Sequence, residues 1–300
     1  MNILIAGGTG LIGTALVALL RDRGDSVRIL TRRRNLSSSD TIQYAEWQSG
    51  AESGLDPHIK WSDALVNLAG ANIGAKRWSQ QRKQEILDSR VQSTGTLGEA
   101  VAHSDAPPSV FVQASAVGYY GYHPAETVLT EDAPAGSDFL AEVCQAWEAA
   151  ANPLAATNVR LAIARFGVVL SPDGGALQRM LPPARMGAGG RLGSGRQPFP
   201  WIHLLDAAAA IIFLIDNQSA QGPFNVASPE SCSNGEFVRA LARSVRRPIL
   251  LFLPAFQVRL MFGEMADMLL EGQNASAQRL QDAGFEFAFG DLEAALHDLV

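Results

Sequence analysis

The chain begins with a feature that leaves few folds open to it, a glycine-rich turn directly after a short apolar strand. Residues 2–6 read Asn-Ile-Leu-Ile-Ala, an apolar run typical of a strand that is buried on both faces. Gly7, Gly10 and Gly13 follow, and an apolar segment of helical period begins at Leu11. Glycines at this spacing allow a tight turn, a close approach of backbone to a phosphate, and close packing of helix on strand. The pattern therefore predicts a strand–turn–helix unit that binds the pyrophosphate of a dinucleotide, although a glycine-rich turn without a ligand is the alternative. The predicted contacts in this turn are Gly7, Thr9, Gly10, Leu11, Ile12 and Gly13.

The end of the next predicted strand, residues 26–31, is where such a fold recognises the adenosine ribose. An Asp or Glu there would bind the ribose 2′-hydroxyl, but the chain continues Thr31-Arg32-Arg33-Arg34 without an acid. Guanidinium groups at this place favour the 2′-phosphate of NADP. We therefore predict NADP(H) as the cofactor, with Thr31 and Arg32 at the 2′-phosphate. A solvated basic loop is the alternative interpretation.

Further apolar strands are predicted over residues 64–70, 110–115 and 158–164, with helical segments between them. This alternation indicates an α/β fold, a Rossmann doubly wound parallel sheet. Ligands lie at the carboxyl ends of such strands, so Leu68, Ala69 and Gly70 should approach the cofactor. A strand followed by a plain turn would explain the same residues.

Composition excludes several classes of function. The chain has 300 residues, 47% of them hydrophobic and 18% charged, with a net charge of −6 and no basic cluster beyond residues 32–34. A nucleic-acid partner is therefore not expected. The sequence has neither a signal-peptide pattern nor eighteen consecutive apolar residues, so we expect a cytoplasmic protein without a membrane partner. Cys144 and Cys232 are too isolated to suggest a disulfide framework or a metal site. The apolar segment 258–270 is expected to lie in the core or at a subunit contact. A homo-oligomer is therefore one expectation.

Longer motifs point to a known family. The glycine turn followed by Asn-Leu-Ala-Gly at residues 67–70 resembles the extended short-chain dehydrogenase/reductase superfamily, which includes nucleotide-sugar epimerases and dehydratases. Ala-Ser-Ala-Val-Gly-Tyr-Tyr-Gly at residues 114–121, Phe-Pro-Trp-Ile-His at 199–203 and Leu-Leu-Glu-Gly-Gln at 269–273 are similar to its atypical "epimerase family protein" subgroup. The resemblance runs from Met1 to the C-terminus.

The resemblance implies further cofactor and substrate contacts. It places Glu85 and Arg90, on a predicted helix over residues 79–102, beside the cofactor, although solvated surface charges are the alternative. It also implies backbone of Val168 and Val169 near the nicotinamide. Trp201 is the predicted substrate contact, in a stretch suited to line a cleft.

The chain departs from the superfamily at the catalytic pair. In active members a tyrosine, held as a phenolate by a lysine four residues later, moves the proton while the nicotinamide moves the hydride. The four tyrosines here, Tyr44, Tyr119, Tyr120 and Tyr122, are followed at that distance by Gln48, His123, Pro124 and Glu126. No lysine follows Lys83, and the family position falls on Phe139 or Leu140 and then Val143 or Cys144.

The missing tyrosine–lysine pair leaves three interpretations open. Tyr119 or Tyr120 could serve as a relocated acid, assisted by Ser115 or His203. The substrate could need little acid help, or the protein could bind NADP without turnover. For each aromatic residue, packing alone is the simpler interpretation. We accordingly expect an NADP(H)-dependent oxidoreductase or nucleotide-sugar epimerase-like enzyme of unknown substrate, with a non-catalytic NADP-binding or redox-sensing protein that acts through a partner as the alternative.

The sequence also suggests a division of the chain. Residues 1–227 are the predicted NADP-binding domain, with residues 171–204 as a substrate-side insertion. The glycine-rich region within it, residues 174–195, is expected to be a substrate-cleft loop, with a plain linker as the alternative. Residues 228–300 are expected to form a smaller, mostly helical cap on the substrate side, with helices over 234–245, 255–270, 276–282 and 292–299.

Overall fold

A parallel sheet of seven strands forms the centre of the protein. The computed structural model describes residues 1–33, 36, 38–39, 41–248 and 251–300. The strand order is β11-β7-β5-β4-β1-β2-β3, which is the doubly wound arrangement that the sequence predicted. The strands are β1 (Asn2–Ala6), β2 (Ser26–Thr31), β3 (Ile42–Glu46), β4 (Ala64–Asn67), β5 (Val110–Ala116), β7 (Arg160–Phe166) and β11 (Gly222–Val226).

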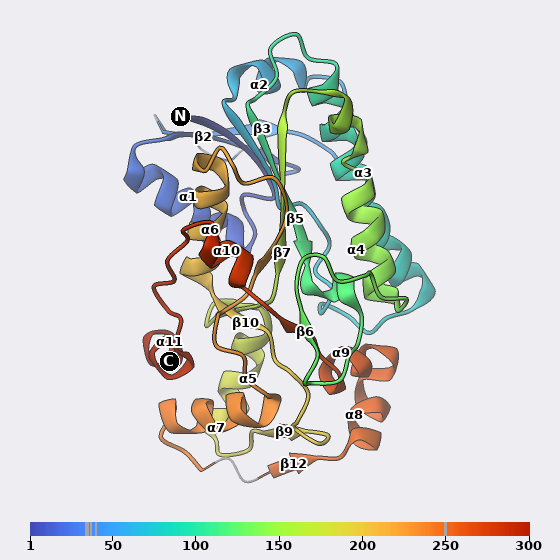
Figure 1. Cartoon of the computed structure of the whole chain (residues 1–300), viewed down its shortest axis with the longest axis vertical. Helices are drawn as coiled ribbons and strands as arrows, with labels where there is room; N and C mark the ends of the chain where they lie inside the picture. The colour runs from blue at the N-terminus through green and yellow to red at the C-terminus, as the bar shows by residue number, and fades with distance from the viewer. Residues whose placement is uncertain (34–35, 37, 40, 249–250) are drawn as a thin grey trace.

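Helices cover both faces of this sheet (Figure 1). On one face lie α1 (Leu11–Arg23) and α6 (Leu204–Asp216), which pack against each other. On the other lie α2 (Asp56–Trp61), α3 (Gln80–Ala102), α4 (Phe139–Ala149) and the short turn η2 (Asn152–Ala156). Ile3 and Ile5 of β1 pack in one buried cluster and Leu4 in another. Because alternate residues of a strand face opposite sides, this explains why residues 3–6 of β1 are apolar without alternation.

A smaller lobe lies beyond the carboxyl ends of the strands. Its helices are α5 (Gly175–Arg185), α7 (Asn234–Ser244), α8 (Ala255–Phe262), α9 (Asp267–Leu270) and α11 (Leu292–Leu299), and α10 (Gln278–Asp282) lies beside β11. Short parallel pairs are β8 (Val168–Ser171) with β10 (Trp201–His203), β9 (Gly190–Leu192) with β12 (Leu251–Leu253), and β6 (Val128–Leu129) with β13 (Asn274–Ala275). Two further short elements are the 3₁₀ helices η1 (Val117–Tyr120) and η3 (Gly263–Ala266).

The structure corrects two predictions about this lobe. The insertion that was expected to be a loop contains α5, because Leu177, Leu181 and Ala184 recur at helical spacing and are buried in the core of the lobe. The helix expected over residues 255–270 is interrupted at Gly263, whose φ of +62° ends α8. In the part of the chain that the structure describes, we find no helix with the length and apolar character to span a bilayer.

Candidate functional site

The glycine turn between β1 and α1 has no room for side chains. Gly7 has a φ of +80°, and a Cβ on it would lie 2.6 Å from the carbonyl carbon of Leu68. A Cβ on Gly13 would lie 2.4 Å from the carbonyl oxygen of Gly7. Gly10, which precedes α1, has no side chain to cap the helix, so the first N–H groups of α1 are available to an anion. The turn therefore has the geometry that a pyrophosphate requires.

The end of β4 lies against this turn. The Asn67 side chain is wholly buried and donates to Thr94 and Gln113, while its Oδ1 accepts from the N–H of Ala69. This fixes the backbone of residues 68–70 beside the glycine turn. A Cβ on Gly70 would lie 3.1 Å from Cζ of Arg90, so Gly70 lets this arginine approach the strand end.

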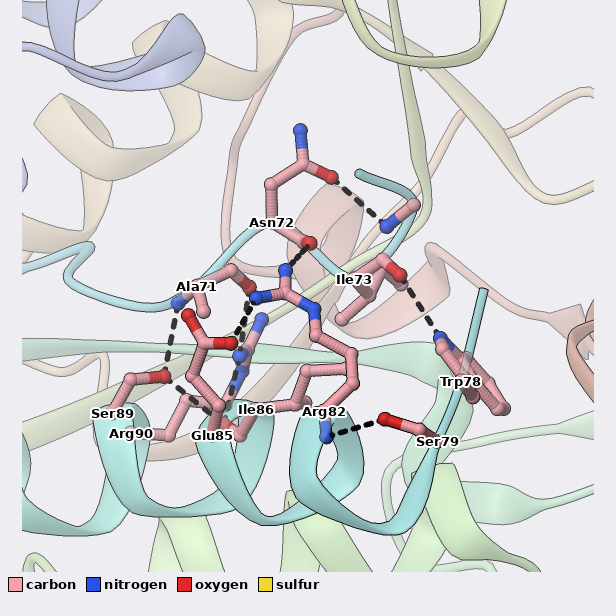
Figure 2. A network of polar contacts seen from close by, with 11 residues as sticks. Ala71, Asn72, Ile73, Trp78, Ser79, Arg82, Glu85, Ile86, Ser89 and Arg90 are labelled. Atoms are coloured by element: carbon pink, nitrogen blue, oxygen red, sulfur yellow. Dashed lines mark hydrogen bonds and ion pairs between the residues drawn. The ribbon is translucent and has the colours of Figure 1, made fainter. Parts of the chain in front are cut away.

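Side chains of α3 hold the loop that follows β4 (Figure 2). Nη1 of Arg90 donates to the carbonyl oxygen of Ala71, at 3.0 Å, and Oγ of Ser89 accepts from the N–H of Ala71, at 2.9 Å. Arg82 donates to the carbonyl oxygen of Asn72 and forms a 2.6 Å ion pair with Glu85. Burial lowers the pKa of Arg90 to about 10, so this guanidinium remains charged at neutral pH.

A cavity of about 580 Å³ lies between α3 and the ends of β2 and β3. Its lining is polar: Arg32, Gln48, Ser49, Gln81, Gln84, Glu85, Asp88, Ser89 and Gln92. Arg32 is exposed and follows β2 directly, whereas the two carboxylates stand opposite on α3. The hydrogen bond from Arg82, with further help from Lys76 and Arg32, lowers the pKa of Glu85. Arg34, which the sequence grouped with Arg32, lies outside the described residues.

A second polar cluster lies at the ends of β5 and β7. Oγ of Ser115 donates to Glu148 at 2.6 Å, and Glu148 accepts two further hydrogen bonds from Arg165, at 2.9 and 2.8 Å. Arg165 also donates to the hydroxyl of Tyr120, which in turn donates to Asn225 at 2.7 Å. Burial alone would lower the pKa of Arg165, but the hydrogen bonds and charge of Glu148 outweigh it and hold that pKa above its ordinary value.

The two predicted tyrosines have different surroundings. Tyr120 is wholly buried, and burial raises its pKa although Arg165 acts in the opposite direction. Tyr119 is half-buried, with its ring centroid 3.6 Å from Cζ of Arg165. Among the described residues, the Tyr119 hydroxyl has no hydrogen-bond partner. Of the two residues predicted at the family position of the lysine, Val143 and Cys144, the cysteine is buried, and burial raises the pKa of its thiol to about 12.

The remaining predicted residues lie on the pair β8–β10. Val168 is paired with Trp201 and Val169 with Ile202. Trp201 is 1% exposed and packs in the core of the lobe. The structure therefore brings Val168 next to Trp201, but their contact is strand pairing and the Trp201 side chain is buried.

His203 is also buried, at the start of α6. Its Nδ1 accepts from the N–H of Leu205, its Nε2 lies 3.2 Å from the Asp298 carboxylate, and its ring stacks on Phe289. Burial lowers the pKa of His203, although Asp298 and Asp206 act in the opposite direction. These contacts place His203 in the interface between α6 and α11, and within the described residues no hydrogen bond or ring contact joins it to Ser115 or the tyrosines.

Sequence reasoning missed several polar residues of these clusters. Glu148, Arg165 and Asn225 complete the network around Ser115, and Arg82 holds the loop after β4. One signal was available, because Arg165 is a charged residue near the end of an otherwise largely apolar strand.

Comparison with known proteins agrees with this geometry. A family model described as "NAD dependent epimerase/dehydratase family" matches residues 3–227. The chain belongs to this family. Residues 253–299 match a second model, a domain of unknown function named DUF1731. The chain is thus an atypical extended short-chain dehydrogenase/reductase, as its motifs suggested.

Relatives in this family resemble the whole chain. An epimerase family protein of Mycobacterium bovis is 44% identical over 297 residues, which cover 98% of this chain and 96% of the relative. One of Staphylococcus haemolyticus is 39% identical, with 99% and 98% covered. The crystal structure of the human epimerase family protein SDR39U1 with NADPH has a TM-score of 0.91 and 36% identity, over 100% of this chain and 99% of that one. A nucleoside-diphosphate sugar epimerase of Corynebacterium glutamicum has a TM-score of 0.79 and 30% identity, over 100% of this chain and 58% of that one.

Proposed function

We propose that this protein is an NADP(H)-dependent oxidoreductase or epimerase-like enzyme of unknown substrate. The observation that carries the choice of cofactor is the cavity beside Arg32, at the end of a strand that no acidic residue follows. A ribose 2′-phosphate beside a guanidinium is a charge-assisted pair. The human relative solved with NADPH supports the same assignment.

The residues around the cavity fit the parts of this cofactor. The N–H groups at the start of α1 would hold the pyrophosphate, and the glycine turn would give it access. Glu85 and Asp88 stand across the cavity from Arg32, where carboxylate oxygens suit the amino group of an adenine rather than a phosphate. Arg90 and the backbone of residues 68–70, 168 and 169 would hold the rest of the cofactor.

The bound cofactor supplies hydride transfer, and the chain supplies the proton chemistry. Tyr119 is the best-placed candidate, since its hydroxyl lacks a partner in the described structure and its ring lies on Arg165. Ser115 and Tyr120 support it through the buried network rather than through free hydroxyls.

One observation favours the second candidate, a non-catalytic NADP(H)-binding or redox-sensing protein. Ser115, Glu148, Arg165 and Tyr120 satisfy one another, as a purely structural network would. Detection of NADPH oxidation with a carbonyl substrate would exclude the non-catalytic candidate, and Tyr119→Phe would then test whether this tyrosine takes part in the chemistry. We expect kcat to fall by about 10²–10⁴-fold, the usual contribution of a positioned acid, with NADPH affinity unchanged. An unchanged kcat would remove Tyr119 from the chemistry.

Arg32→Ala tests the cofactor. Loss of one charge-assisted hydrogen-bonded partner should weaken NADPH binding about ten- to hundredfold and leave NADH binding unchanged, measured by calorimetric titration. Arg21→Ala, which removes an exposed arginine at the far end of α1, is the matched control and should bind both as the wild type does. Equal loss for NADPH and NADH, or no loss, would contradict the 2′-phosphate assignment.

A further inference from the structure

Exposed apolar side chains gather at one end of the small lobe. We call this surface the apolar tip: Met186, Leu251, Phe252, Phe256, Leu260 and Met261. Their exposed fractions run from 49% for Phe252 to 77% for Leu260. Among the described residues, only Met1, Val128 and Leu205 are other large hydrophobic residues with comparable exposure. The tip is therefore a patch and not the usual scatter of single exposed residues.

The packing of β12 and α8 explains why these side chains are exposed. Figure 1 shows β9, β12 and α8 at the end of the long axis opposite the N-terminus. Among the described strands β12 pairs only with the short strand β9, and Val258 is the one buried residue of α8. Phe256 and Leu260 are four residues apart, so they share the outward face of this helix. A Cβ on Gly187 would lie 3.4 Å from the carbonyl oxygen of Pro248, which brings Met186 to the same surface.

The segments that build the tip are strongly basic. Residues 185–196 and 237–263 contain no Asp or Glu, although the whole chain has a net charge of −6. They contain eight arginines: Arg185, Arg191, Arg196, Arg239, Arg243, Arg246, Arg247 and Arg259. Cζ of Arg191 lies 5.2 Å from the ring centroid of Phe252, and Arg259 lies between Phe256 and Leu260 along α8. Only Arg243 and Arg259 of these form ion pairs within the described residues, with Glu293 and Asp267.

This combination restricts what can cover the tip. A second copy in a twofold dimer would bring two arginine-rich surfaces against each other, which is unfavourable. A nucleic acid would pair with the arginines but would leave Leu251, Leu260 and Met261 without apolar contacts. An anionic lipid surface satisfies both, because apolar side chains enter the boundary between headgroups and acyl chains while arginines bind the phosphates.

We propose that the apolar tip binds reversibly to an anionic lipid surface. Phe252, Phe256 and Leu260 enter that surface by about 5–10 Å, as side chains of interfacial helices do. The contact is peripheral and does not cross the bilayer. It nevertheless differs from the sequence-based expectation that the protein has no membrane partner. It does not depend on the proposed cofactor, whose cavity lies between α3 and the sheet.

Flotation of the whole protein with vesicles tests the proposal. We expect it to float with vesicles of phosphatidylcholine and phosphatidylglycerol, not with phosphatidylcholine alone, and to be released by high salt. Phe256→Ser with Leu260→Ser should reduce the bound fraction about tenfold. Val128→Ser, which replaces a residue that is 61% exposed on β6, is the matched control and should not change binding. Unchanged NADPH binding and thermal unfolding would show that each variant is folded.

Two kinds of result would overturn the proposal. The first is no binding of the wild type to either vesicle, or equal binding by the wild type and the α8 double variant. The second is a wild-type dimer in sedimentation velocity that becomes a monomer in the double variant, because the tip would then be covered by a second copy of this chain.

Discussion

Glu148→Ala should lower the free energy of unfolding by about 3–5 kcal/mol, the usual result of removing one partner from a buried ion pair. The side chain of Arg165 is 4% exposed, and Glu148 accepts two of its hydrogen bonds. Without Glu148, this guanidinium stays buried with only the Tyr120 hydroxyl and the Glu131 carbonyl as acceptors. Ser115 loses its acceptor as well.

Urea unfolding of Glu148→Ala beside Glu293→Ala provides the comparison. Glu293 pairs with Arg243 on the surface, and both side chains are more than half exposed, so its loss should cost less than about 1 kcal/mol. The loss of unfolding free energy in Glu148→Gln should lie between those of the two alanine variants, because the amide keeps one acceptor oxygen but not the charge. Equal, small losses for Glu148→Ala and Glu293→Ala would show that the buried network contributes little to stability.

The parts of the fold that local patterns determine could be predicted. β1, β2 and the helix after the glycine turn follow from short apolar runs and glycine spacing. The helix predicted over residues 79–102 is α3, and Ser79 caps it by accepting from the N–H of Arg82. In each case the signal lies within a few residues of the element itself.

Other parts could not be predicted, because they depend on contacts between distant segments. Glu148 lies on α4 and Arg165 on β7, and no local spacing links them. Pro182 and Pro183 argue against a helix where α5 forms, yet burial of Leu177 and Leu181 outweighs them. The segment 258–270 is expected to be core or a subunit contact, and only the packing of α8 through Val258 shows that its other face is exposed.

The candidate site divides in the same way. The location of Arg32 beside the cavity could be predicted because its place after β2 fixes its place in the fold, whereas its contact with a cofactor stays a prediction. His203 could not be assessed from sequence, since its contacts come from α11 at the opposite end of the chain. The absence of the Tyr-x-x-x-Lys pair was evident from the sequence, whereas the Arg165 guanidinium beside Tyr119 was not.

Gly13→Ala should weaken NADPH binding about hundredfold or more and destabilise the fold by about 1–3 kcal/mol. The added Cβ would lie 2.4 Å from the carbonyl oxygen of Gly7 and 2.6 Å from Cα of Gly8, so the turn must move away from α1. That movement displaces the backbone that a pyrophosphate needs at the start of the helix. Calorimetric titration measures the first effect and thermal unfolding the second.

Gly95→Ala separates the geometry of the turn from the loss of a glycine as such. Gly95 lies within α3, and a Cβ on it meets no atom within 4 Å. Alanine there should leave NADPH binding unchanged and stabilise the helix by about 0.5–1 kcal/mol, because the unfolded chain loses less conformational freedom on folding. If Gly13→Ala bound NADPH as tightly as Gly95→Ala does, the phosphates could not lie on the turn between β1 and α1. The cofactor would then have to be bound through the Arg32 cavity alone. A larger loss of NADPH affinity in Arg32→Ala would reveal this.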